Sequence, residues 1–517
     1  MSNISGYLPE SAVNTATPLY PKKTVITTIR RHHVRREVNP ARNRLTFCKH
    51  TMRNLSVADR ALFERFGQGP LIKLPFNTIH RAFEAQVATQ PQAIAVEHLG
   101  EAITYHDLNQ QADRLAAILM QHGVSTGDNV ALFVRRSIPM LVGIFAILKA
   151  GAAYVPQDVL VAPQVQLRHV LDTTSARVIL THSDFRHLIP VSDGSICLAI
   201  DEVMQKPLGD QIIDTVTGRS QVAVSRDEQC FILFTSGTTG KPNGVQVTHG
   251  NVCNILLTEP GNLGMRPGLK VGQILNISFD MAAWEILGCL ANGATLVIRG
   301  KAFEPVVEQV DVLIATPSIL SRFDADKNRH IKVVAVAGEP CPRSLADKWS
   351  QFCRFYNACG PTETTIINTA QRYQPGSVRL TIGKPTPNNT VYVLNDDRQP
   401  CAIGEVGEMW AGGDGVSAGY LHNDVLTAER YLPDPFLGHG RIMFRTRDLA
   451  RWTPEGELEH FGRTDDQVKI RGFRVELDSV STALESVPHC QRAITLKLDN
   501  RHLIGFVSPS PDISCVL

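Results

Sequence analysis

Apolar and polar positions follow two recurring patterns along the chain. In Ile79–Pro91 and Leu108–Val124 apolar residues recur every three or four positions, which predicts amphipathic helices, the second ending at Gly123. Short apolar runs of the type found in strands recur at Ala93–His98, Glu101–Leu108, Val130–Val134 and Ala176–His182. The alternation of the two patterns predicts an α/β body whose sheets are largely buried.

Composition supports a globular protein. The 517 residues are 43% hydrophobic, enough for a large core and for two to four domains. The longest apolar run, Met140–Leu148, stops at Lys149 and is far shorter than the roughly 20 residues that span a bilayer. Eleven cysteines include no CxxC pair, and their odd number fits a reduced compartment. We therefore expect a core helix at Met140–Leu148, buried thiols and no membrane role.

Positive charge gathers at the N-terminus. The first 51 residues hold nine Lys and Arg but only two Glu, whereas the whole chain has a net charge of +2. This segment lacks acidic balance and helical periodicity, so we predict a basic, disordered extension over residues 1–70 of a cytoplasmic protein. An organellar transit peptide and a start at Met52 are the alternatives. Aromatic stacking residues do not accompany the charge, so nucleic-acid binding is not expected.

A domain boundary is expected near Gly462–Gln467, where a Gly-rich, strand-rich region gives way to a short charged connector. The body is then residues 71–463 and the C-terminal part residues 464–517. Fifty residues are few for an independent core, so we expect the chain to stop inside its last domain.

The run FTSGTTGKPNGV, Phe234–Val245, follows an apolar segment and is rich in Gly and Thr. Glycines let backbone N–H groups crowd around an anion, and hydroxyls add donors, so the loop is suited to a triphosphate. It does not match the Walker loop, because GxxxxGK[ST] is absent and a second strand follows. A plain hairpin turn is the alternative.

Further motifs stand in order along the chain and give the loop a context. Together with the loop they resemble the adenylate-forming superfamily, and specifically the adenylation domains of nonribosomal peptide synthetases. The motifs are Leu148–Asp158, Asn276–Ile286, Asn357–Thr365, Gly407–Leu421, Phe444–Trp452 and Gly462–Leu477. The resemblance implies a large two-sheet α/β domain, a β-barrel-like part near Thr381–Arg463, and a small, C-terminally truncated α+β domain.

The resemblance also implies the reaction and its cofactors, ATP and Mg²⁺. A carboxylate attacks the α-phosphorus of ATP and expels pyrophosphate, so positioned donors and a hard cation must meet the developing charge. In this family the phosphate loop wraps the triphosphate; here that loop is Thr235, Ser236, Gly237, Thr238, Thr239 and Gly240.

The remaining nucleotide and catalytic positions transfer in the same way. Glu363 matches the magnesium ligand and follows Thr362, and Asp448 matches the carboxylate that binds both ribose hydroxyls. The other matching positions are Asn357 and Arg463 at the nucleotide, Lys469 among the catalytic residues, and Asp465 at the hinge about which the small domain swings. A surface salt bridge is the alternative for Asp448 and Arg463.

Asp280 decides between substrate classes. In members that activate amino acids an Asp at this position pairs with the substrate ammonium, whereas acyl and aryl-acid ligases generally lack it. The alternative is an Asp that merely begins a helix. The side-chain pocket transfers as Met281, Trp284, Ala315, Ala335, Ala337, Ala358, Ile366 and Ile367. With no ionisable group among them, these residues favour a bulky neutral side chain, although each could equally fill the core.

Several positions depart from the family pattern. Asn243 stands where the phosphate loop usually has Lys, Cys359 replaces a Tyr that stacks on adenine, and Arg447 replaces a Gly. The chain also ends at Leu517, before the family's lysine loop, which predicts impaired turnover.

Three hypotheses remain. The first is an amino-acid adenylating ligase that hands its product to a phosphopantetheine carrier protein. The second is an acyl or aryl-acid CoA ligase of the same fold, against which Asp280 argues. The third is a catalytically weak remnant that binds nucleotide. The near-match to GxGxxG in Gly412–Gly419 has no βαβ unit around it, so a dinucleotide site is not expected.

Overall fold

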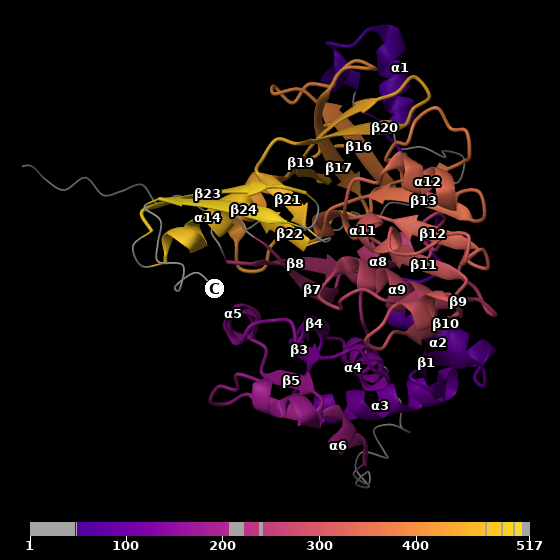
Figure 1. Ribbon diagram of the computed structural model, residues 1–517, viewed down its shortest axis with the longest axis vertical. Helices are drawn as coiled ribbons and strands as arrows, with labels where there is room; N and C mark the ends of the chain where they lie inside the picture. The colour runs from indigo at the N-terminus through magenta and orange to yellow at the C-terminus, as the bar shows by residue number, and fades with distance from the viewer. Residues whose placement is uncertain are drawn as a thin grey trace, which may run out of the picture. The chain divides into compact units, whose positions relative to one another are not determined.

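The computed structural model describes residues 47, 49–205, 222–236, 241–470, 473–487, 490–499 and 502–508. Among these residues, three sheets of five or more strands account for most of the strand content (Figure 1). The predicted phosphate-loop residues Gly237–Gly240 lie outside the described residues.

The first sheet has six strands in the order β6-β5-β3-β4-β7-β8. Its strands are β3 (Asn129–Val134), β4 (Ala153–Asp158), β5 (Val178–Thr181), β6 (Ile196–Ala199), β7 (Gln229–Thr235) and β8 (Asn243–Thr248). All neighbours are parallel except β7 and β8, which form the hairpin around the phosphate loop. The predicted strands Val130–Val134 and Ala176–His182 are confirmed, and the apolar runs fit a sheet buried on both faces.

The second sheet has nine strands in the order β15-β14-β13-β12-β11-β9-β10-β1-β2. They are β1 (Ile94–His98), β2 (Glu101–Thr104), β9 (Lys270–Gln273), β10 (Thr295–Ile298), β11 (Val312–Ala315), β12 (Val333–Val336), β13 (Arg354–Cys359), β14 (Thr369–Tyr373) and β15 (Lys384–Pro385). The strands from β10 through β13 run parallel, so their carboxyl ends share one edge. Polar residues that follow these strands are thereby collected in one place.

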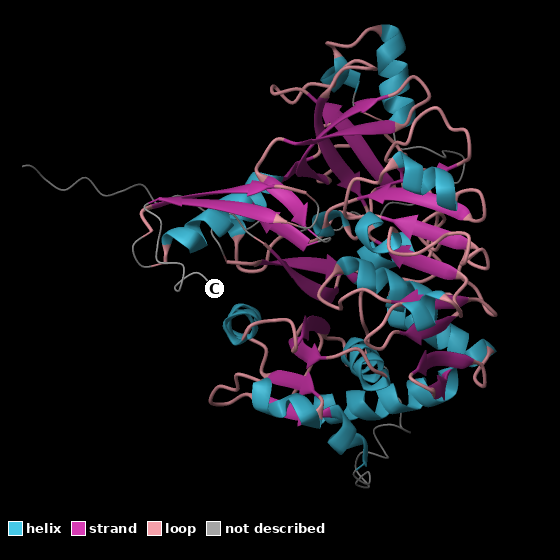
Figure 2. Cartoon of the chain, in the orientation of Figure 1, coloured by secondary structure: helices cyan, strands magenta, loops and turns pink. Residues whose placement is uncertain are grey.

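Helices flank the two sheets (Figure 2). The longer ones are α2 (Ile79–Thr89), α3 (Tyr105–Gln121), α4 (Ile138–Lys149), α5 (Gln164–Thr174), α8 (His249–Leu256) and α9 (Asp280–Ala291). The shorter ones are η2 (Ser183–Leu188), α6 (Ile200–Gln205), α10 (Glu304–Val307), α11 (Pro317–Leu320), α12 (Arg343–Trp349), η3 (Thr362–Thr364) and α13 (Asp424–Arg430).

The apolar run Met140–Leu148 is the core of α4, as predicted. Ser137 caps this helix by accepting a hydrogen bond from the Met140 N–H, and Met140 through Leu148 are all buried. Its apolar residues on every side fit a helix surrounded by protein. No helix in the described part of the chain has the length and apolarity to cross a membrane.

The third sheet contains β16 (Asn389–Leu394), β17 (Gly407–Gly413), β18 (Tyr431–Pro433), β19 (Ile442–Trp452) and β20 (Leu458–Arg463). It corresponds to the predicted β-barrel-like part. An N-terminal helix, α1 (Val57–Phe66), preceded by η1 (Lys49–Met52), packs on it. Phe63 of α1 is fully buried and stacks on Tyr392 with ring centroids 5.9 Å apart. The disorder predicted for residues 1–70 therefore does not hold for α1, whose apolar face is buried by residues far along the chain.

The C-terminal part begins with a hairpin of β21 (Gln467–Ile470) and β22 (Phe473–Glu476). Helix α14 (Leu477–Glu485) and the pair β23 (Arg492–Lys497) and β24 (Leu503–Ser508) follow. Residues 43–517 cluster as one compact unit, to which this α+β part belongs. In the described residues after Thr464 the elements are of the α+β type that was predicted for the C-terminal part, whose bounds stay a prediction.

Candidate active site

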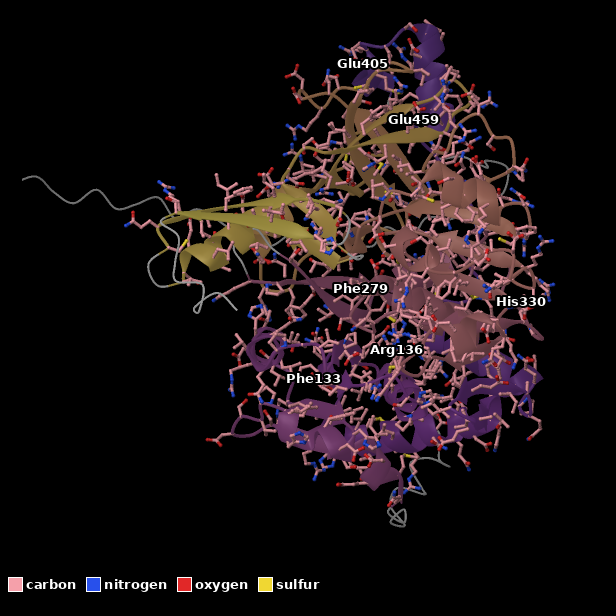
Figure 3. The ribbon with its side chains drawn as sticks, in the orientation of Figure 1. Phe133, Arg136, Phe279, His330, Glu405 and Glu459 are labelled. Carbon is pink, nitrogen blue, oxygen red and sulfur yellow. The ribbon has the colours of Figure 1, made fainter. Side chains whose placement is uncertain are left out.

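Asp280 opens α9 directly after Phe279, which Figure 3 labels. Its Oδ2 accepts a hydrogen bond of 2.8 Å from the hydroxyl of Thr362 in η3. Burial raises the pKa of Asp280, while the Thr362 hydrogen bond and the charge of Lys469 act in the opposite direction. A carboxylate in the first turn of a helix is favoured by the helix dipole. The side chain is thus held in place, and a cation beside it would favour its charged form.

The predicted pocket residues come from α9, from the ends of β11, β12 and β13, and from the segment after η3. All of them are buried members of the same apolar core: Met281, Trp284, Ala315, Ala335, Ala337, Ala358, Ile366 and Ile367. Met281 Sδ and Thr316 Cγ2 both lie within 4 Å of the position that a Cβ on Gly338 would take. The start of α9 therefore faces the carboxyl ends of β11 and β12.

The backbone beside this pocket is strained. Thr365 and Ile366 have φ angles of 60° and 71°, a region that β-branched residues rarely occupy. Such a conformation costs on the order of 1–3 kcal/mol per residue. The hydroxyl of Thr365 donates a 2.7 Å hydrogen bond to the carbonyl of Gly415, which helps to hold the turn. Residues in such conformations are concentrated at functional sites. Here the turn that they form determines the position of Ile366.

A second carboxylate, Asp448, lies on β19 beside its ladder partner Arg463 on β20. Its Oδ1 accepts a 3.0 Å hydrogen bond from Arg463 Nη1 and lies 3.3 Å from His460 Nε2. Although burial opposes ionisation, the contacts with His460 and Arg463 keep the pKa of Asp448 below its usual value. The structure thus brings two predicted nucleotide residues together and adds His460, which sequence reasoning missed.

Asp465 lies in the turn after β20, where the hinge was predicted. Arg463 holds both of its oxygens, with Nε to Oδ1 at 2.7 Å and Nη2 to Oδ2 at 2.9 Å. Arg447, which stands where the family has Gly, has a φ of 63° and donates to Glu429 at 2.6 Å. Its Nη1 also lies 3.5 Å from Asp465 Oδ2. The hinge region is therefore tied to β19 and α13 by ion pairs.

Glu363 in η3 is fully buried. Arg474 on β22 donates from Nη1 to Oε1 at 2.9 Å and to Oε2 at 3.1 Å, and the Tyr420 hydroxyl donates to Oε1 at 2.7 Å. Although burial opposes ionisation, Arg474 and then Arg430 lower the pKa of Glu363 to about 2. Sequence reasoning missed these partners, which lie far from Glu363 in the chain. The predicted metal ligand is thus an ionised carboxylate already paired with an arginine.

Lys469 on β21 is the ladder partner of Arg474, so both side chains lie on the same face of the hairpin. Burial and then the nearby charge of Arg474 lower the pKa of Lys469, while Asp280 and Asp448 act to raise it. In the described residues no carboxylate lies within 4 Å of its ammonium. Lys469 therefore lies within electrostatic reach of Asp280, predicted to bind the substrate, and of Asp448, predicted to bind the ribose.

The phosphate-loop hairpin lies next to Glu363. Val245 of β8 pairs with Tyr420, whose hydroxyl contacts Glu363. Thr235 ends β7, and the hydroxyl of Ser236 is buried without a hydrogen-bond partner in the described part of the chain. An orphaned donor of this kind is expected where an anion binds.

Two other predicted nucleotide positions have protein partners. Asn357 on β13 donates from Nδ2 to the carbonyl of Thr381 at 2.7 Å. Asn243, in the place of the usual Lys, accepts a 3.0 Å hydrogen bond from Asn423. Burial raises the pKa of Cys359 to about 12, so this residue is a neutral thiol. Positions 243 and 359 therefore both carry neutral side chains.

Comparisons with known proteins identify the family of the chain. The AMP-binding enzyme family matches residues 83–421. Adenylate-forming reductase 06235 from Coprinopsis cinerea is 47% identical over 460 residues, which cover 88% of this chain and 44% of the relative. Gramicidin S synthase 1 from Brevibacillus brevis is 34% identical over 422 residues, 79% of this chain and 37% of the relative. The chain thus spans less than half the length of these relatives.

Solved structures show the same fold. NpsA-ThdA, an artificially fused adenylation-PCP di-domain from Klebsiella oxytoca, has a TM-score of 0.76 and 26% identity, and the match covers 84% of this chain and 89% of that one. The predicted α/β adenylate-forming fold and the resemblance to synthetase adenylation domains are confirmed. The chain belongs to the AMP-binding enzyme family and is homologous to the adenylation domains of nonribosomal peptide synthetases.

Proposed function

We propose that this protein converts an amino acid with a bulky neutral side chain and ATP into aminoacyl-AMP and pyrophosphate. The observation that carries the proposal is the position of Asp280, a carboxylate held by Thr362 beside Met281 and the apolar residues that follow β11, β12 and β13. A substrate ammonium would neutralise this carboxylate, and the pocket residues would exclude water from the side chain.

The pocket residues argue for a neutral side chain. They carry no ionisable group, and the polar indole N–H of Trp284 is already donated to the carbonyl of Gly261. A charged substrate side chain would lose its hydration without gaining a partner. Aromatic, large aliphatic and acyl-modified side chains all meet this requirement.

In the proposed reaction an oxygen of the substrate carboxylate forms a bond to the α-phosphorus, and the bond between that phosphorus and the β-phosphate oxygen breaks. We assign Asp448 and Arg463 to the ribose, Asn357 to the nucleotide, and the loop that begins at Thr235 to the triphosphate. Lys469 supplies positive charge where the two substrates meet.

Adenylate-forming enzymes use ATP and Mg²⁺, and the bound ion would supply further positive charge to the phosphoryl oxygens. We assign Asp465 to the hinge. Solved relatives that carry a PCP domain support a carrier protein as the acceptor of the product.

A second candidate follows from the adenylate-forming reductases among the relatives. The substrate is then another carboxylic acid, which is activated by the same chemistry. The activated acid is the substrate of a later reduction. Asp280 favours the amino acid, because a buried carboxylate without a cationic partner is costly.

Amino-acid-dependent ATP–pyrophosphate exchange separates the candidates. We expect exchange with large neutral amino acids, and we expect Asp280→Asn to lower kcat/KM for them by roughly 30- to 5,000-fold, the equivalent of about 2–5 kcal/mol. Asp326→Asn, at an exposed residue, is the matched control. Exchange supported only by acids without an amino group, and unaffected by Asp280→Asn, would favour the second candidate.

A further inference from the structure

Three arginines that the proposed reaction does not use gather where parallel strands of the two large sheets end. Arg135 and Arg136 follow the last residue of β3, and Arg299 follows the last residue of β10. We call these three residues the arginine cluster. Arg136, which Figure 3 labels, donates from Nε to the carbonyl of Leu275 at 3.1 Å and so joins the end of β3 to the segment after β9. The carboxyl ends of parallel strands are the places where open α/β sheets commonly bind ligands.

The positive charge of the arginine cluster has no ion-pair partner. In the described residues no carboxylate oxygen lies within 4 Å of a guanidinium nitrogen of Arg135, Arg136 or Arg299. Arg322 adds a fourth guanidinium nearby, since Arg299 and Arg322 lie 4.2 and 4.9 Å from the centroid of the same ring, that of Phe303. Burial, and then the charge of Arg136, lower the pKa of Arg299 to about 10. Like charges are thus crowded together without an opposite charge in contact.

Two carboxylates whose charge reaches the cluster are already occupied. Glu285 accepts hydrogen bonds of 3.0 to 3.3 Å from the backbone N–H groups of Ile274 and Leu275, and burial raises the pKa of Glu285 to about 8. Its carboxyl group is therefore largely uncharged at pH 7. Asp158 accepts a 3.1 Å hydrogen bond from the N–H of Leu160. Neither carboxyl group neutralises the arginines by contact.

Several donors of the cluster are free. Arg136 and Arg299 each use Nε on a backbone carbonyl, that of Leu275 at 3.1 Å and that of Ile274 at 2.7 Å. These bonds hold the two guanidiniums in place. Both Nη atoms of Arg136 and every nitrogen of the Arg135 guanidinium lack a hydrogen-bond partner in the described part of the chain, and none of these atoms is sealed from solvent. A dissolved ion can therefore reach donors that are already positioned.

We propose that the arginine cluster is a binding site for a small oxyanion of the phosphate or carboxylate class, made of residues that the adenylation site does not use. The planar guanidinium fork matches two oxygens of such an anion, and charge-assisted hydrogen bonds of this kind are among the strongest in proteins. The anion also offsets the repulsion among the three positive charges. Because Arg136 and Arg299 are half-buried and fixed by backbone carbonyls, the site suits a small anion rather than a broad polyanionic surface.

The site is linked to Asp280 through the backbone. The two carbonyls that Arg136 and Arg299 hold belong to the segment after β9, which continues into Phe279 and Asp280 at the start of α9. A bound anion restrains the two guanidiniums and, with them, this segment. Occupancy of the site therefore affects how firmly Asp280 is held.

Titration calorimetry tests the site directly. The protein is first saturated with Mg²⁺ and a non-hydrolysable ATP analogue, so that the phosphate loop is occupied. Inorganic phosphate is then titrated at constant ionic strength, and a parallel titration with acetate distinguishes the phosphate class from the carboxylate class. We expect saturable binding of at least one of the two anions. Arg135→Gln should weaken this binding by roughly 10- to 100-fold, because one charge-assisted contact is lost.

The Arg135→Gln variant should fold, because the Arg135 side chain has no partner in the described residues. Arg398→Gln, at an exposed arginine between β16 and β17, is the matched control and should bind the anion as the unaltered chain does. Three results would overturn the proposal: equal affinities in the unaltered chain and in Arg135→Gln, an equal loss in the two variants, or no binding of either anion.

Deuterium exchange tests the link to Asp280. Backbone N–H groups of Ile274–Phe279 should exchange with solvent deuterium about fivefold more slowly when the anion is present at saturation, and Arg135→Gln should remove this protection. Exchange that does not respond to a bound anion would overturn the link. Neither measurement depends on which acid the protein activates, so both remain decisive if the proposed substrate class is wrong.

Discussion

Two buried histidines predict that the protein loses stability in mild acid. His80 on α2 is 1% exposed and His249 on α8 is fully buried, with their rings edge to face at a centroid distance of 5.3 Å. His249 Nδ1 accepts from the Ile79 N–H at 3.4 Å, while His80 Nδ1 and His249 Nε2 are buried without partners in the described residues. Protonating either ring would place a positive charge in an apolar core.

The magnitude follows from the pKa of His80. Burial, and then the charges of Arg81 and Lys149, lower the pKa of His80 to about 3, and burial lowers the pKa of His249 as well. Below pH 6.5 the unfolded chain binds protons that the folded chain does not, so the free energy of unfolding falls as the pH falls. The loss is about 1.4 kcal/mol per pH unit for each histidine, hence about 2 kcal/mol for His80 between pH 7 and pH 5.

Glu285 acts in the opposite direction and must be separated from this effect. Burial raises the pKa of its carboxyl group to about 8. The unfolded chain therefore releases a proton that the folded chain keeps, and stability is lost as the pH rises from 4.5 to 8. The overall pH dependence is a sum of such contributions, so the histidine effect is measured as a difference between a variant and the unaltered chain.

The assay is urea unfolding followed by tryptophan fluorescence at a series of pH values from 5 to 7. Between pH 7 and pH 5 the free energy of unfolding should fall by about 2 kcal/mol less in His80→Gln than in the unaltered chain. The reason is that one group that titrates in the unfolded chain has been removed. The same substitution at exposed His122 is the matched control. If His80→Gln has the same pH dependence as the unaltered chain, the reasoning from burial is wrong.

Two further substitutions test the packing. Phe63→Ala should lower the free energy of unfolding by about 3–5 kcal/mol in calorimetry, because a fully buried ring is removed, whereas Val57→Ala at an 84% exposed position should have an effect of less than about 0.5 kcal/mol. Gly383→Ala should lower the melting temperature sharply, since its Cβ would lie 2.0 Å from the backbone of Ala370. Gly376→Ala has a similar φ but open space and should cost only about 1–2 kcal/mol; equal losses at the two glycines would contradict this reasoning.

Elements with a strong local pattern could be predicted from the sequence. The helix expected over Leu108–Val124 is α3, which begins earlier, at Tyr105. The strand expected over Glu101–Leu108 ends at Thr104, because the Thr104 hydroxyl accepts from the Asp107 N–H and starts the helix. The strand was predicted too long because the N-cap residue Thr104 lies within the apolar alternation that indicated a strand.

The site could be predicted in part. Motif residues such as Asp280 and Asp448 were found because their neighbours in the chain are distinctive. The pairing of Glu363 with Arg474 was missed, since the two residues are 111 positions apart and no local pattern connects them. The left-handed conformation of Arg447 was also missed, although its place in a Gly position was the available signal. Long-range pairs depend on the fold, which local patterns do not encode.

The docking of α1 has a consequence during synthesis of the protein. Its partners Tyr392 and Trp410 belong to strands made long after the helix itself. At about 5–20 residues per second, the roughly 330 residues between Phe63 and Tyr392 take about 15 to 65 s to translate. During that interval the apolar face of α1 lacks these two partners and is open to chaperones or to other nascent chains. The first α-helix of the described chain is thus among the last to be buried.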